Sequence, residues 1–106
     1  MQTLPTWAER SRFRYSGSVR EGTTVAYGRR FSFSISLSAS HYRALLNHFR
    51  GQTVNIGTSR TNPPRGSVGE WLQSHVTRTA IVSYIGPILI AEGFAEKVRG
   101  PRIRFK

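Results

Sequence analysis

Residues 80–91 have the sequence Ala-Ile-Val-Ser-Tyr-Ile-Gly-Pro-Ile-Leu-Ile-Ala, and this apolar run decides how the rest of the chain can fold. Start signals at Thr77 or Thr79 and a stop signal at Gly93 predict a helix over the run. Its apolar residues lie on nearly every side, and such a helix is normally buried. Pro87 cannot donate to the carbonyl four residues earlier, so we expect a kink. Two roles stay open: a core helix, with or without a dimer interface, and a helix that contacts a partner.

Another helix is predicted just before this run. Ser67-Val68-Gly69-Glu70 matches a capping box, in which the Ser67 hydroxyl accepts from the N–H of Glu70 and the Glu70 carboxylate accepts from the N–H of Ser67. The helix should end near His75. A turn of about two to four residues would then separate the two helices, which makes them a helix-turn-helix candidate.

Further elements are predicted upstream. Residues 41–50 should form a helix with one apolar stripe, capped by Ser38 or Ser40. Residues 52–56 predict a short strand, and residues 58–66 predict a loop that is rigid at its double proline.

The C-terminal end predicts a hairpin of residues 94–98 and 101–105. Phe94 and Val98 are expected to point inward on its first strand. The outer face of its second strand should carry Arg102, Arg104 and Lys106.

The N-terminal part predicts an antiparallel β segment over residues 10–37. Its first strand should bury Phe13 and Tyr15 and expose a cationic face, because apolar and basic residues alternate. That face would carry Arg10, Arg12 and Arg14. A turn at Glu21-Gly22 predicts a hairpin.

Residues 31–38 form the most regular strand pattern, with serines on one face. The other, inward face would carry Phe31, Phe33, Ile35 and Leu37. Residues 1–9 show no period and are expected to form an arm. We therefore expect one α+β domain over residues 1–106, made of this arm, the β segment and a helical core over residues 39–106.

The charge balance is the strongest functional signal. Lys and Arg number 16 against 5 acidic residues, which gives a formal net charge of +11, and nearly all of the cations are arginine. Arginine pairs bidentately with phosphates and with guanine edges. A surface this positive favours a polyanionic partner, and nucleic acid is the first choice. There are two alternatives: an acidic partner of another kind, or an arginine-rich composition that has no functional meaning.

The order helix, strand, helix, turn, helix, hairpin over residues 39–106 resembles the winged helix-turn-helix domain. The passage Ile88-Leu89-Ile90-Ala91-Glu92-Gly93-Phe94-Ala95-Glu96-Lys97-Val98 is similar to the point where a recognition helix runs into the wing. The chain is also similar to small uncharacterised proteins of mobile gene cassettes and phage. The resemblance implies a three-helix core with a C-terminal β-hairpin wing.

By that resemblance, residues 67–75 would be the support helix, 79–91 the recognition helix and 94–105 the wing. The expected nucleic-acid-binding residues, on the recognition helix, the wing, the loop and the N-terminal strand, are Arg10, Arg12, Arg14, Arg60, Arg65, Arg78, Thr79, Ser83, Lys97, Arg99, Arg102 and Arg104.

The expected partner is duplex DNA, contacted mainly through phosphates, by a regulator or accessory factor of a mobile element or bacterial genome. RNA is an alternative, because Arg12, Phe13, Arg14 and Tyr15 interleave cations with rings as single-strand platforms do. A symmetric homodimer through residues 80–91 is also expected, and a protein-interaction module or homodimer that uses these residues without nucleic acid is a further alternative.

Enzymatic chemistry is not expected. The chain has no cysteine, no aspartate, no nucleophile elbow, no phosphate-cradling glycine loop and no histidine spacing typical of a metal site. We expect no cofactor, metal or small-molecule substrate. The N-terminus shows no leader pattern and no apolar run is long enough to span a membrane, so a cytoplasmic location is expected.

Overall fold

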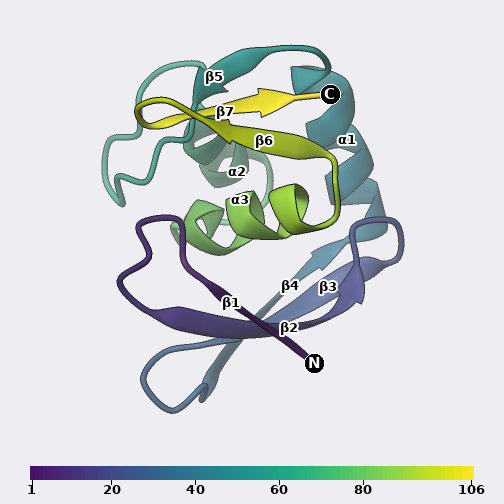
Figure 1. Cartoon of the computed structure of the whole chain (residues 1–106), viewed down its shortest axis with the longest axis vertical. Helices are drawn as coiled ribbons and strands as arrows, with labels where there is room; N and C mark the ends of the chain where they lie inside the picture. Colours follow the sequence, from purple (N-terminus) through teal and green to yellow (C-terminus); the bar gives the residue numbers. More distant parts are fainter.

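The apolar run forms helix α3 (Val82–Ala91), which lies between two antiparallel sheets (Figure 1). The computed structural model describes residues 1–106. The first sheet has the order β1-β2-β3-β4, with strands Gln2–Pro5, Arg12–Ser18, Gly22–Tyr27 and Phe33–Ser38. The second has the order β5-β7-β6, with strands Thr53–Asn55, Arg102–Phe105 and Ala95–Val98. With helices α1 (Ala39–Phe49) and α2 (Val68–His75), the chain is an α+β fold, as expected.

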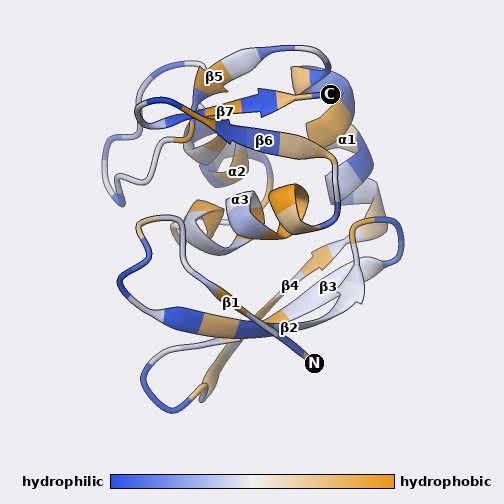
Figure 2. Cartoon of the chain, in the orientation of Figure 1, coloured by the Kyte–Doolittle hydropathy of each residue, from blue (hydrophilic) through white to orange (hydrophobic).

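The hydrophobic core surrounds α3, where Ile85, Ile88 and Leu89 are fully buried. Figure 2 shows hydrophobic colour on α3 and hydrophilic colour on the outer turns. Most of the apolar surface that suggested a homodimer therefore packs within the same chain, while Pro87 and Ile90 are only partly buried and line a surface hollow. None of the three helices has the length and the apolar character of a membrane span.

Strand β2 follows its sequence pattern, with Phe13 and Tyr15 buried and Arg12 and Arg14 exposed. The expectation of an arm over residues 1–9 was wrong in part, because β1 pairs with β2. An edge strand with little burial has backbone hydrogen bonds but no apolar alternation, so the pattern could not reveal it.

Strand β4 was predicted with four apolar residues inward, and this is only half correct. Leu37 is buried, but Phe33 is 60% exposed and Phe31 precedes the strand with a φ of 55°. The reason is that the β3–β4 turn extends away from the helices, which cover only the other end of the strand (Figure 1).

The helix caps confirm the predicted starts of α1 and α2, with one correction. The hydroxyl of Ser67 accepts from the N–H of Glu70 at 3.1 Å. The Glu70 carboxylate accepts from the N–H of Gly66 at 2.8 Å instead of that of Ser67, whose N–H donates to Pro64. Within the turn over residues 64–67, the N–H of Ser67 already has a backbone acceptor. The Glu70 carboxylate therefore accepts from the N–H of the preceding residue, Gly66.

Helix α3 begins at Val82, and neither Thr77 nor Thr79 caps it, so the predicted start was wrong. Residues 76–81 separate it from α2, a longer connection than expected. The helix starts where Ile81 and Val82 enter the core, because their burial outweighs the weak preference of a threonine cap.

The C-terminal hairpin forms as predicted, and Phe94, just before its first strand, packs partly buried against the core as expected. The strand itself faces the other way. Cross-strand pairs share a face, and Ala95 pairs with Phe105 while Lys97 pairs with Ile103. Ala95 and Lys97 therefore face the core side, and Val98 lies opposite Arg102 on the outer side. Val98 was expected inward because it is apolar, but the register places it opposite Arg102, and Ala95 is the buried residue of this strand.

Candidate nucleic-acid interface

Most of the positive charge has no carboxylate partner within the chain. Arg104 and Lys106 both pair with Glu96, and the hydrogen bond from Arg104 holds the pKa of that carboxyl below its usual value. Lys97 lies 3.7 Å from Glu9. Every other arginine is exposed and forms no ion pair, so its charge is available to a partner.

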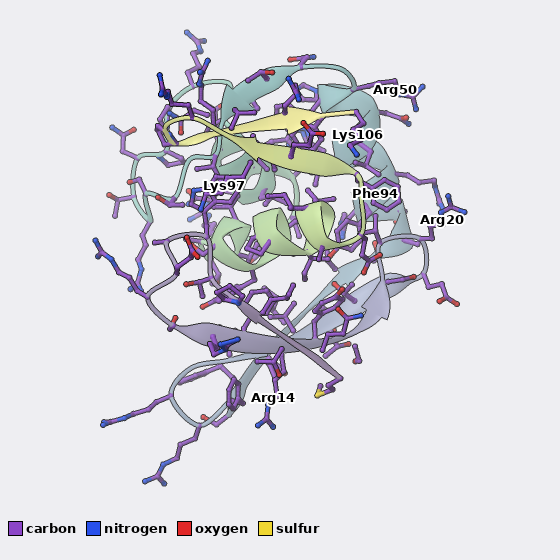
Figure 3. All side chains as sticks on the ribbon, viewed as in Figure 1. Arg14, Arg20, Arg50, Phe94, Lys97 and Lys106 are labelled. Carbon is purple, nitrogen blue, oxygen red and sulfur yellow. The ribbon has the colours of Figure 1, made fainter.

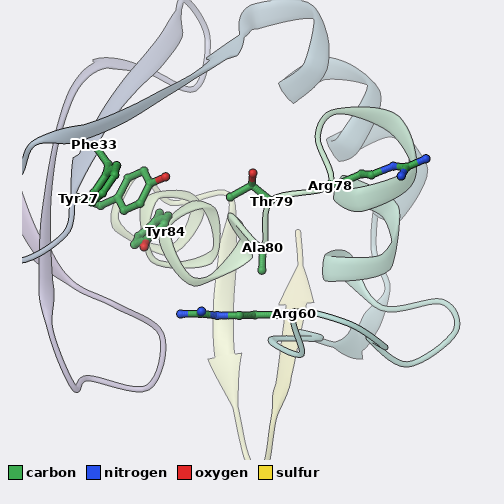
Figure 4. A pocket seen from close by; sticks show the side chains of 7 residues that line it. All are labelled: Tyr27, Phe33, Arg60, Arg78, Thr79, Ala80 and Tyr84. Carbon is green, nitrogen blue, oxygen red and sulfur yellow. The ribbon is translucent and has the colours of Figure 1, made fainter.

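Three adjoining hollows, which we call the basic groove, gather several of these arginines. The middle hollow has a volume of about 440 Å³ and is lined by Tyr27, Phe33, Arg60, Arg78, Thr79, Ala80 and Tyr84 (Figure 4). One neighbour shares Tyr84 and includes Arg12, Arg29 and Phe31. The other shares Arg60 and Arg78 and includes Asn62, Glu70 and Gln73.

Segments far apart in the sequence form the middle hollow. Tyr27 ends β3 and faces Phe33 at the start of β4 as its register partner. Tyr84 lies in the first turn of α3. Arg60 belongs to the loop after β5 and extends toward Tyr84, whereas Arg78 precedes α3 and points away from the rings (Figure 4).

The rings in this hollow are stacked. The centroids of Tyr27 and Tyr84 are 4.9 Å apart with 28° between their planes, and those of Tyr27 and Phe33 are 5.6 Å apart with 24°. Burial raises the pKa of the Tyr84 phenol, and the neighbouring Tyr27 adds to this while the positive charge of Arg60 opposes it. On the adjoining surface, the guanidinium of Arg14 lies 4.2 Å from the centroid of the Phe31 ring, a cation–π contact.

The groove brings together four of the residues expected from the sequence: Arg12, Arg60, Arg78 and Thr79. Arg10 lies beside it, before the lining residue Ser11. Arg65 is exposed but lines none of the three hollows. Ser83 is half-buried, and its carbonyl oxygen accepts from the N–H of Trp7 at 3.0 Å.

The expected wing residues lie on the other sheet, and two of them are already engaged. Lys97 donates to the carbonyl of Trp7 at 2.9 Å and lies 4.6 Å from the centroid of its ring, while Arg104 pairs with Glu96. Arg102 donates to the carbonyl of Arg99 at the hairpin tip. The tip lies on the same side as the loop that carries Arg60, and Ile56 joins the two by donating to Pro101 (Figure 1).

Sequence analysis missed Tyr27, Arg29, Phe31 and Phe33 as site residues. It named Phe13 and Tyr15 as the stacking rings, but these are buried, with exposed fractions of 0% and 1%. The sequence does contain a usable signal. Gly28 is followed by Arg29 and Arg30, a pattern that predicts a basic turn next to Phe31 and Phe33.

No protein-family model, no curated protein and no solved structure matches this chain. Function must therefore be inferred from the chemistry of the groove. The groove offers guanidinium groups, hydroxyls and aromatic ring faces, which are groups that bind phosphates and bases.

Proposed function

We propose that the protein binds nucleic acid along the basic groove, mainly through phosphates. The observation that carries this proposal is the convergence of Arg12, Arg29, Arg60 and Arg78 from separate segments onto one surface. Glu70 is the only acid that lines the three hollows, and its carboxylate already accepts from Gly66. Unpaired guanidinium groups on such a surface attract a polyanion and release its counterions on binding.

The order α1, β5, α2, α3, β6, β7 supports a winged-helix-like arrangement of residues 39–106, with β5 joined to the hairpin through β7. Because most of α3 is buried between the sheets and Tyr84 is its one residue in the groove, we assign the nucleic-acid contacts to the groove and the hairpin tip and not to base reading by α3. Binding through phosphates with little base reading suits a DNA-binding accessory factor of a bacterial genome or mobile element.

The test compares two double variants that remove the same charge from different faces. Arg60→Ala/Arg78→Ala changes the groove, whereas Arg20→Ala/Arg50→Ala changes the side near α1 (Figure 3). All four side chains are exposed, so both variants should fold. Affinity for duplex DNA and for a single strand would be measured by fluorescence anisotropy over a range of salt concentrations, with an acidic protein as a control ligand.

The groove variant should weaken binding and reduce the slope of log affinity against log salt by about 1.4 for a single strand and about 1.8 for a duplex, the values for two lost phosphate contacts. The control variant should change both quantities less. Equal effects of the two variants would indicate attraction by net charge alone and would contradict the groove as the binding surface.

A further inference from the structure

The rings of the basic groove form a column that runs outward from the core. Its inner end is Tyr84, which meets the buried ring of Phe13 edge-on at a centroid distance of 5.3 Å. Tyr27 lies in the middle, and Phe33 is the outer end (Figure 4). The column is therefore anchored at one end by the packing of the protein interior.

The outer end of the column is open to water. Phe33 is 60% exposed, and Met1 is the only other large hydrophobic residue that is exposed. Gly28 makes room for this ring, because it has a φ of +90° and a Cβ there would lie 2.8 Å from Phe33. A ring held in this way contributes little burial to the fold but presents a flat π-face to a ligand.

Positive charge and a hydroxyl lie beside the rings. Arg60 extends toward Tyr84 from below the column, and Arg78 and Thr79 complete the rim of the hollow (Figure 4). No carboxylate lines this hollow, whose volume of about 440 Å³ lies in the range of small-ligand sites. Aromatic faces next to unpaired guanidinium groups match a base and its neighbouring phosphates.

We propose that this column stacks an unpaired base of a single-stranded nucleic acid, with Phe33 as the outer platform, Arg60 holding the adjacent phosphate and Arg78 a phosphate further along the strand. The inference rests on the proposed function and narrows it to a class of ligand. Stacking on aromatic rings tolerates any sequence, because every base has a π-face. A blunt duplex keeps its bases stacked inside and can use only the phosphate contacts.

The experiment uses the full chain and three probes: a short single-stranded oligonucleotide, its abasic counterpart with the same backbone, and a blunt duplex. Phe33→Ala should weaken binding of the base-containing strand about 10-fold, which corresponds to about 1.4 kcal/mol. It should leave the abasic strand unaffected. Phe33→Leu, which keeps an apolar side chain without a ring, should behave like the alanine variant, and Phe33→Trp should retain wild-type affinity.

Three results would overturn the stacking site while leaving phosphate binding intact. The first is equal affinity of the wild type for the base-containing and abasic strands, and the second is an unchanged affinity of Phe33→Ala. The third is a free mononucleotide that binds as tightly as the oligonucleotide, which would identify a nucleotide pocket. If none of the three probes binds, the proposed function itself fails. Because Phe33 is mostly exposed, its variants should fold, and circular dichroism would verify this.

Discussion

The backbone N–H of Trp7 donates a 3.0 Å hydrogen bond to the carbonyl oxygen of Ser83. In a continuous helix that carbonyl would accept from residue 87, but Pro87 has no N–H. The proline therefore leaves free the acceptor that holds the N-terminal segment against α3. Gly86 contributes space, since a Cβ there would lie 3.0 Å from the Trp7 ring. Gly86 and Pro87, which would weaken an isolated helix, thus form the docking site for the distant segment that carries Trp7.

The first prediction concerns this docking site. Trp7→Ala should lower the free energy of unfolding by about 3–5 kcal/mol, because the indole is buried against α3 and beneath the Lys97 ammonium. Urea unfolding followed by circular dichroism measures the change. Met1→Ala is the control, since that side chain is 74% exposed and should alter stability by no more than about 0.5 kcal/mol. A similar small effect of Trp7→Ala would contradict the structural role of this segment.

A second prediction concerns the base of the loop that carries Arg60. A Cβ on Gly69 would lie 1.8 Å from the carbonyl oxygen of Gly57, so the backbone must shift to admit one. Although alanine favours helices, Gly69→Ala should destabilise the fold by about 1–3 kcal/mol through overpacking. Ser74→Ala, an exposed change in the same helix, is the comparison. If urea unfolding gave Gly69→Ala equal or greater stability than the wild type, the close approach of these glycines would be wrong.

A third prediction concerns alkaline pH. Burial, with a smaller effect of the hydrogen bond to Glu92, raises the pKa of Tyr15 from 10.0 to about 12. The unfolded chain therefore loses this proton first. Tyr15 contributes its full stabilisation below pH 10, and the contribution declines as the pH rises toward 12. Urea midpoints should fall over this interval, and the fall should be smaller in Tyr15→Phe. An identical pH dependence in the two proteins would exclude Tyr15 as a source of the decline.

The fourth prediction separates two arginines of the C-terminal hairpin. Arg102 pairs with no carboxylate, whereas Arg104 pairs with Glu96. Arg102→Ala should lower the salt slope for duplex DNA by up to about 0.9, the value of one phosphate contact. Arg104→Ala should lower it much less, because its guanidinium already has a partner. Each change should cost about 0.5 kcal/mol of stability at most. A slope that Arg102→Ala leaves unchanged, measured by anisotropy, would remove the hairpin tip from the interface.

Much of the local structure could be predicted because its signals lie within a few residues. Alternation in β2 correctly assigned Phe13 to the core and Arg12 to the surface. The hydroxyls of Ser38 and Ser67 accept from the N–H groups three residues later, which is a local geometry visible in the sequence. The hairpin around Gly100 likewise followed from a turn between two short patterned strands.

The candidate site was predicted less completely, because its residues meet only after distant segments pack together. Arg60 was named for its charge and Arg78 for its place at the start of the expected recognition helix, and nothing in the chain order places them beside Tyr27 or Phe33. Phe33 was expected in the core and so was not chosen as a site residue, because alternation shows only which residues share a face of a strand. It does not show where along that strand the covering helix ends.

The α+β class, most helices and hairpins, and the excess of arginine that indicates a polyanionic partner can all be read from the amino-acid sequence. The position of α3 between the two sheets and the pairing of β1 with β2 follow only from how the segments pack. The spacing of apolar residues shows which face of a helix or strand is buried, because burying an apolar side chain lowers the free energy whichever residues cover it. Which elements supply those contacts depends on shape and on close approaches such as that of Trp7 to Gly86, and these arise only when the segments pack.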